Sequence, residues 1–193
     1  MIGPLKRTQS GHMHLLVTMN KFTKWIEAKA VTNQRANTTI EFIEELVVRF
    51  GVPNRIVTDL GSNFIEGKFF DHCDKLDIKI CYASVGHPRA NGQARQGNRM
   101  ILHGVKARIF DRLSDYRTRW MCELQSVLWG IGTSKIRATG FIPFLLISGS
   151  EVVLTTELKF GSPRVKNYNE ENAMRRQQDN TISLDEARMT VII

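Results

Sequence analysis

Three positions along the chain could bring polar chemistry to one edge of a β-sheet. Asn20 ends an apolar segment typical of a strand, Asp59 ends a second such segment, and Arg95 follows a loop-like stretch rich in proline, glycine and asparagine. The ends of neighbouring strands and the first turn of a following helix can converge at one edge of an α/β sheet. A carboxylate at that point would bind a cation, whereas an arginine would bind phosphate.

The stretch HPRANGQARQGNRM, residues 87–100, is unusual for the start of a helix. It contains three arginines and no acid, although the partial positive charge of a helix N-terminus favours a carboxylate. Residues 89–119 hold eight basic side chains against two acidic ones, in a chain of net charge +8. Such a segment fits sequence-independent binding to a nucleic-acid backbone, and the alternative is a solvated helix face. The candidate nucleic-acid-binding residues are Arg89, Asn91, Gln93, Arg95, Arg99 and Lys106.

Asp59 and Arg95 each have two interpretations. Asp59 is either a metal ligand or a strand-end aspartate that caps the following turn. Arg95 is either a phosphate contact at a helix start or a surface arginine that pairs with Asp59. The residue types leave both alternatives open.

Composition limits the class of protein. The chain has 193 residues, of which 42% are hydrophobic and 24% charged, as in globular domains. Three widely spaced cysteines without a CxxC motif indicate buried thiols in a reducing compartment. The longest apolar run, residues 141–147, is too short to cross a bilayer, and no signal peptide is apparent, so we expect a nuclear or cytoplasmic protein without a membrane or small-molecule partner. Met1 directly precedes a strand-like segment, so we expect a piece of a longer protein.

Hydrophobic periodicity predicts an α/β domain. The expected elements are antiparallel strands over 14–20 and 22–31, a helix over 36–50, a short buried strand over 55–59, a helix around 69–76, a strand over 78–83, a helix over 94–109 after a loop at 86–92, a helix around 120–131, a helix beginning at Pro143, and a helix opened by Ser183 and Glu186. Trp120 and Trp129 are expected in the core.

Seven short motifs give the chain a family resemblance. In order they are KFTKWIEA, FGVPNRIVTD, GSNF, HPRANGQ, LQSVLW, ATGFIPF and GSEVVL. Together they resemble the catalytic core of retroviral-type integrases, most closely those of gypsy-type LTR retrotransposons. The resemblance implies an RNase H-like α/β fold, with a mixed five-stranded sheet flanked by helices, over residues 1–165. Residues 166–193 would then be a charged linker with the start of a truncated helix.

The resemblance also implies a metal site. In the family, three carboxylates hold two Mg²⁺ or Mn²⁺ ions that activate the attacking oxygen and stabilise the leaving oxygen of a phosphodiester. The matching positions are Asn20, Asp59 and Arg95, with 35 residues between the second and the third, so Asp59 is the one acid that is kept. Glu66 is the only nearby acid that could substitute. We therefore expect an integrase core for DNA integration whose catalytic activity is lost or nearly lost.

Further departures from the family pattern support this expectation. Leu60 replaces the usual asparagine after the second acid, Ile142 replaces the usual serine or threonine cap, and the usual aspartate two residues before Gly3-Pro4 is absent. The alternative function is an inactive module that binds DNA without sequence preference or associates with itself, most simply as a homodimer.

Overall fold

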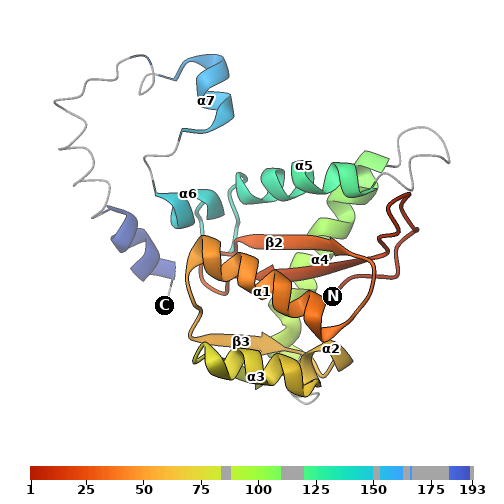
Figure 1. The fold of residues 1–193 in the computed structure, drawn as a ribbon. Helices are drawn as coiled ribbons and strands as arrows, with labels where there is room; N and C mark the ends of the chain where they lie inside the picture. The colour runs from red at the N-terminus through yellow and green to blue at the C-terminus, as the bar shows by residue number, and fades with distance from the viewer. Residues whose placement is uncertain (84–87, 110–119, 150–152, 163–165, 167–182, 192–193) are drawn as a thin grey trace. The chain divides into compact units, whose positions relative to one another are not determined.

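The computed structural model describes residues 1–83, 88–109, 120–149, 153–162, 166 and 183–191. These residues form two compact units (Figure 1). The first contains residues 1–19 and 26–128, and the second contains residues 20–25 and 129–193. No described helix combines the length and the apolar character that a membrane crossing requires.

A β-hairpin forms the centre of the first unit. Strand β1 (His14–Met19) pairs antiparallel with β2 (Ile26–Val31). On the other edge of β1, Leu15 pairs with Ile2. Strand β1 therefore has neighbours on both edges, and its first three residues are buried. The expected start of β2 at residue 22 was wrong, because residues 20–25 form a turn.

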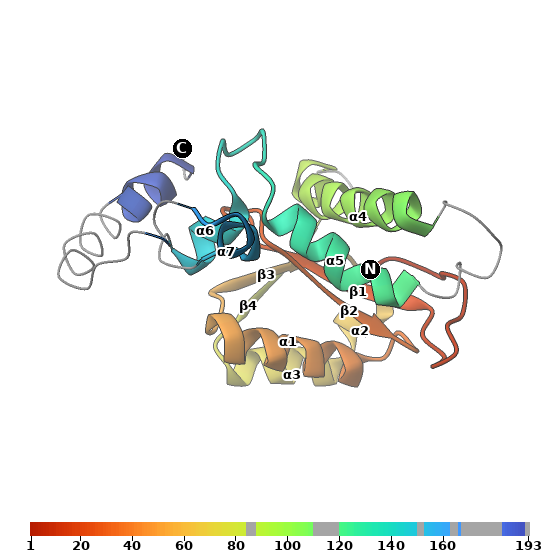
Figure 2. The ribbon, with the colours of Figure 1, turned by 90° about the horizontal axis from the view of Figure 1, so that it is seen from above.

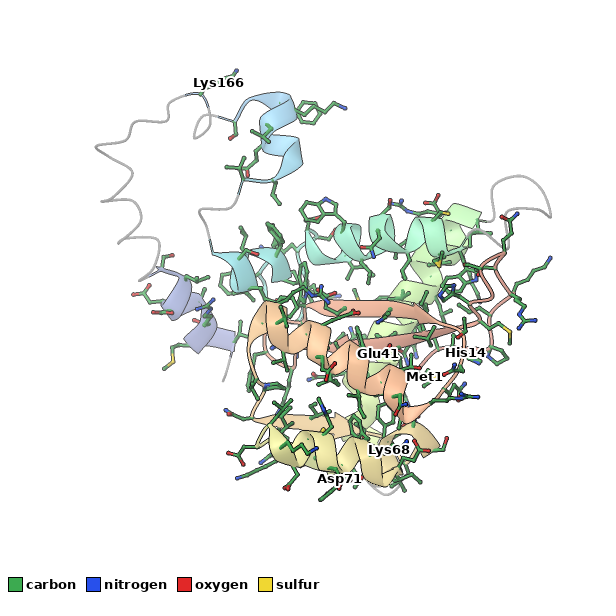
Figure 3. All side chains as sticks on the ribbon, in the orientation of Figure 1. Met1, His14, Glu41, Lys68, Asp71 and Lys166 are labelled. Atoms are coloured by element: carbon green, nitrogen blue, oxygen red, sulfur yellow. The ribbon has the colours of Figure 1, made fainter. Side chains whose placement is uncertain are left out.

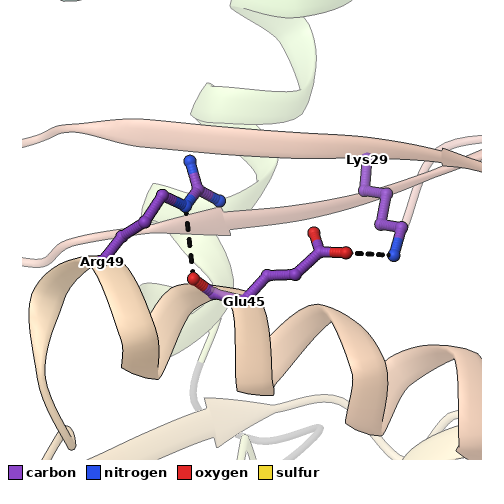
Figure 4. Close-up of polar contacts among 3 residues, drawn as sticks. All are labelled: Lys29, Glu45 and Arg49. Atoms are coloured by element: carbon purple, nitrogen blue, oxygen red, sulfur yellow. Dashed lines mark hydrogen bonds and ion pairs between the residues drawn. The ribbon is translucent and has the colours of Figure 1, made fainter.

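Helix α1 (Ala36–Phe50) spans the predicted residues and covers one face of the hairpin. Its Phe42 packs with Leu16 and Val31. Two ion pairs, Lys29–Glu45 at 2.6 Å and Arg49–Glu27 at 3.0 Å, join the helix to β2. Figure 4 shows Lys29 and Arg49 meeting Glu45 through its carboxylate and its backbone oxygen, respectively. Apolar packing at the centre of the contact and ion pairs at its edge thus hold the helix against the hairpin.

A second pair of strands is parallel and lies on the same side of α1 and α3 (Gly67–Lys75) as the hairpin (Figure 2). Strand β3 (Arg55–Thr58) pairs with β4 (Lys79–Tyr82), and helices α2 (Ser62–Ile65) and α3 lie between them in the chain. Phe69, Cys73 and Ile78 form a core with residues of α1. Strand β3 was expected to be buried, but its Val57 is 54% exposed, because the described residues place no layer over that face.

The described strands form two two-stranded sheets, one antiparallel and one parallel. A mixed α/β fold is therefore present. The five-stranded sheet stays a prediction, since no hydrogen-bonded ladder joins the two sheets among the described residues.

Helix α4 (Pro88–Ile109) packs on β1. In Figure 2 it lies on one side of the strands, whereas α1 and α3 lie on the other. The predicted loop at 86–92 was wrong in its second half, because the helix begins at Pro88, whose fixed φ suits a first helical turn. Arg95 is consequently in the second turn, beyond the first turn over which the helix dipole acts most strongly.

Two glycines bring α4 close to its neighbours. An added Cβ at Gly97 would lie 2.9 Å from Met19 Cε, and one at Gly104 would lie 2.7 Å from Cγ1 of Val127. Val127 belongs to α5 (Trp120–Gly132). Both separations are shorter than the contacts between packed carbon atoms. The helix can therefore lie this close to its neighbours only because positions 97 and 104 are glycines.

The second unit contains the end of α5, α6 (Pro143–Ser148), α7 (Thr155–Phe160) and a helical segment over 183–191. Phe144 contacts Trp25 and Trp129, with ring centroids 6.0 and 5.1 Å apart. Trp120 is buried as expected, but Trp129 is 42% exposed and so is not a core residue. Pro143 is at the start of α6, where it was expected. The boundary at residue 165 falls among residues outside those described.

The cysteines differ in environment. Cys73 is buried, Cys81 is half-buried and Cys122 is exposed on α5. Burial raises the pKa of the Cys73 thiol. The expectation of three buried thiols was therefore wrong for Cys122, which lies on the outer face of an amphipathic helix.

The packing of α4 predicts opposite effects for two glycine substitutions in the same helix. Gly104→Ala should lower the free energy of unfolding by about 1–3 kcal/mol, because the new methyl group would collide with the buried, stiff Val127 side chain. Gly92→Ala is the matched control. Its Cβ meets nothing within 4 Å, so it should leave stability unchanged or raise it by up to about 1 kcal/mol. Urea unfolding of the three proteins measures both effects, and equal stability of the two variants would contradict the packing argument.

Candidate nucleic-acid interface

A shallow groove of about 410 Å³ runs along the exposed face of α4. Its lining residues recur every three to four positions, so they lie along one side of the helix. They are Arg95, Asn98, Arg99, Leu102, His103 and Lys106. The structure therefore brings together three of the predicted nucleic-acid-binding residues, Arg95, Arg99 and Lys106.

Three lining residues were not predicted. Asn98, Leu102 and His103 were not among the candidate nucleic-acid-binding residues. The buried stripe of α4 consists of Gly97, Ile101 and Val105, with Asn98 and Leu102 at its half-buried border. Helical spacing from Arg95 and Arg99 could have identified His103, because it continues their row by one further turn.

The groove is positively charged and is not neutralised locally. Arg95, Arg99 and Lys106 are all exposed, and none of them forms an ion pair with another described residue. By contrast, Arg108 of the same helix pairs with Glu123 at 3.3 Å. Three cations that pair with no described acid, spaced along one helix face, form a surface suited to a row of anionic groups.

The remaining predicted interface residues are only partly described. Gln93 is half-buried on α4. Arg89 and Asn91 belong to the first turn of the helix, and their side chains lie outside the described residues.

Asp59 is exposed and follows directly after β3. Its Oδ1 accepts a hydrogen bond of 3.1 Å from the backbone N–H of Gly61. A Cβ on Gly61 would lie 3.0 Å from the same oxygen, so glycine allows this close approach. The carboxylate thus caps the turn that leads into α2, as one of its two interpretations predicted. The described residues contain no ion pair between Asp59 and Arg95.

Comparisons with known proteins agree on one family. A family model described as "Integrase core domain" matches residues 2–88, which include Asp59 and end at the start of α4. The Retrovirus-related Pol polyprotein from transposon 412 of Drosophila melanogaster is 24% identical over 149 residues. The match covers 77% of this chain and 12% of that polyprotein. The predicted resemblance to retroelement integrase cores is confirmed.

Solved integrase structures show the same fold. The HTLV-2 integrase catalytic core domain in complex with magnesium has a TM-score of 0.57, with 18% identity, covering 69% of this chain and 83% of that one. The catalytic core domain of BIV integrase gives a TM-score of 0.57, with 16% identity over 69% of this chain and 84% of that one. Over the part of the chain that these matches cover, the fold is therefore that of integrase catalytic cores.

Asn20 has a structural task in this chain. Its Oδ1 accepts hydrogen bonds from the backbone N–H groups of Phe22, at 2.9 Å, and Thr23, at 3.0 Å. These contacts close the turn after β1, which explains why β2 begins later than the apolar pattern indicated. The side-chain oxygen at the position that the resemblance matches to a metal ligand is thus already engaged in the turn.

The acids of the described residues do not fit a pair of divalent metal ions. No three His, Cys, Asp or Glu side chains gather where a metal could bind them, within the described part of the chain. Glu66 lies at the residue before α3 and forms no such group with Asp59. A two-metal site needs several converging carboxylates to balance its charge. Asp59 with Arg95 on a neighbouring helix does not provide them.

The turn after β3 generates a prediction about stability. Asp59→Ala should lower the free energy of unfolding by about 1 kcal/mol, because the N–H of Gly61 loses its acceptor. Asp59→Asn keeps an oxygen at the same place and should cost much less. Thermal unfolding of both variants beside the native chain measures this, and equal losses in the two variants would exclude the capping role.

Proposed function

We propose that this chain is an integrase core that binds DNA through α4 and has lost the metal-dependent strand-transfer reaction. The proposal depends chiefly on the groove of α4. At position 95, where the family resemblance implies a glutamate ligand, the chain presents an arginine in line with Arg99 and Lys106. The chain spans only 12% of the transposon polyprotein that it matches, so the proposal concerns this core and not a whole polyprotein.

The shape and charge of the groove favour a polyanion as its ligand. A shallow surface with exposed cations contacts phosphates well but encloses too little of a small molecule to hold it. Phosphate contacts carry no base information. Binding should therefore show little sequence preference and should weaken steeply as the salt concentration rises.

Electrostatics argue against metal-dependent catalysis. Two unit charges 4 Å apart interact by about 4 kcal/mol at an effective dielectric constant of 20, and a dication doubles this value. Arg95 near a metal ion would add this repulsion, whereas a glutamate would contribute the same magnitude as attraction. With Asp59 as the remaining acid of the three, we infer that Mg²⁺ or Mn²⁺ binds weakly and that the transfer reaction does not proceed.

Self-association is a further part of the proposal. The HTLV-2 core domain was solved in dimeric and trimeric forms. We propose that this chain forms a homodimer, and sedimentation equilibrium at several protein concentrations would measure it.

Neutralising the groove should reduce DNA binding. The triple variant Arg95→Gln, Arg99→Gln, Lys106→Gln removes three phosphate contacts. Its affinity for a labelled duplex should fall at least roughly tenfold at about 0.1 M salt, and the log–log salt slope should become shallower by about 2.7. Fluorescence anisotropy over a series of salt concentrations measures both quantities.

A matched control distinguishes the effect of where the positive charges lie from the effect of the net charge on DNA affinity. Lys68, Lys75 and Lys79 are exposed on α3 and β4, and Figure 3 labels Lys68 on α3. Replacing all three by Gln changes the net charge by the same amount. This control should bind duplex nearly as tightly as the native chain. An equal loss in both triple variants would show that the groove has no special role.

The metal site can be tested by reversing Arg95. The native chain should show no strand transfer of oligonucleotide ends with Mg²⁺ or Mn²⁺, and its Mn²⁺ affinity, measured by calorimetry, should be weak. Arg95→Glu should bind Mn²⁺ more tightly than Arg95→Ala, because only the first adds a ligand.

Adding Asn20→Asp to Arg95→Glu tests position 20. A further gain in Mn²⁺ affinity supports a metal role there, and an unchanged affinity assigns the residue to the turn. Transfer by the native chain that Asp59→Ala abolishes would overturn the proposal.

A further inference from the structure

The turn between β1 and β2, residues 20–25, contains two lysines, Lys21 and Lys24, and an exposed aromatic ring, Phe22. Backbone hydrogen bonds close it at both ends, from Asn20 N to Trp25 O at 2.9 Å and from Lys24 N to Asn20 O at 3.0 Å. The side chain of Asn20 accepts the N–H groups of Phe22 and Thr23 within the turn. These hydrogen bonds fix the backbone conformation of the turn, so the directions in which its side chains leave the backbone are also fixed.

The two lysines lie together, and no acid among the described residues pairs with either of them. The amine of Lys24 donates a hydrogen bond to the backbone oxygen of Lys21. Burial, together with the charge of Lys21, lowers the pKa of Lys24. Within the described part of the chain, neither amine is within ion-pair distance of a carboxylate. The turn therefore concentrates positive charge that an external anion would neutralise.

An exposed ring lies beside this charge. Phe22 is 47% exposed, and Nζ of Lys21 is 5.7 Å from the centroid of its ring. A small inorganic anion would make no use of the ring. In a duplex, the bases are stacked on one another and cannot reach it. A single strand offers both a phosphate and an unstacked base.

We propose that the β1–β2 turn binds single-stranded nucleic acid, with the amines of Lys21 and Lys24 on a phosphate and the ring of Phe22 against an adjacent base. This function is additional to duplex binding by α4 and does not require it. The turn supplies the combination of cation and aromatic surface that sequence-independent single-strand binding uses.

The chain contains a natural control for this arrangement. Lys159 lies over the ring of Phe160, also 5.7 Å from its centroid, on α7 of the same unit. Phe160 is 76% exposed. A second lysine, Lys166, is also close, with its Nζ 3.2 Å from where a Cβ on Gly161 would lie. These groups lack the closed turn of residues 20–25, so they test whether a ring and lysines bind a strand without that turn.

The test is fluorescence anisotropy of the full chain with a labelled single-stranded oligothymidylate, on the background of the α4 triple variant. Lys21→Gln with Lys24→Gln should weaken binding about tenfold and make the log–log salt slope shallower by about 1.4. Phe22→Ala should weaken binding at least roughly fivefold, whereas Phe22→Tyr should keep it. Lys159→Gln and Phe160→Ala should each stay within about twofold.

Two outcomes would overturn the proposal in this assay. One is unchanged binding by the lysine variant, and the other is an equal loss in the Lys159 and Phe160 controls. If the turn variants weaken duplex binding as strongly as single-strand binding, the turn is a general backbone contact and the single-strand assignment is wrong. Loss of duplex binding in the α4 variant tests the other surface separately, so the two proposals can fail independently.

A second measurement uses the native chain alone, so a variant that fails to fold cannot affect it. Nuclear magnetic resonance of isotopically methylated lysines in the native chain reports the pKa of each amine. Saturating oligothymidylate should raise the pKa of Lys24, because a phosphate stabilises the charged form. The resonance of Lys159 should not shift. An unchanged pKa of Lys24 in the saturated complex would exclude a phosphate beside its amine.

Discussion

The outer surface of α4 depends on how closely its inner face approaches the rest of the first unit. At Gly97 and Gly104, an added Cβ would lie 2.9 and 2.7 Å from side-chain carbons of Met19 and Val127. These contacts set the rotation of the helix about its own axis, because any other rotation would bring side chains into the same spaces. The rotation places Arg95 and the rest of its row in solvent, so the basic groove is a consequence of packing on the opposite side.

The same fold can carry either a metal-binding site or a phosphate-binding surface after substitution of only a few residues. A two-metal site requires acids from separate elements to converge, and its geometry is lost when one of them is replaced. A phosphate-binding surface needs only cations repeated along one helix face. Here Asp59 caps the turn before α2 and Asn20 closes the turn after β1. Both positions therefore have a task in the fold that is independent of any metal.

Sequence patterns predicted the elements best where one hydrophobic period extended over a long segment. Helix α1 has its predicted bounds, since its apolar face repeats regularly and Gly51, at φ +81°, ends it. The patterns failed where a single polar contact decided the outcome. The start of β2 was misplaced because the Asn20 side chain draws Phe22 and Thr23 into a turn. The start of α4 was misplaced because proline, glycine and asparagine are typical of loops but are also tolerated within a helix whose other face is well packed.

The sequence by itself determined the charge of the α4 segment, the resemblance to integrase cores and the residue types at the three implied metal positions, because these are properties of residue types in order. Only the tertiary structure decided which cations share a face, that Trp129 and Val57 are exposed, and that Lys21 and Lys24 meet in one turn. The physical reason is that residue type sets the charge and polarity of a side chain, whereas its neighbours depend on packing and backbone closure between segments distant in the chain.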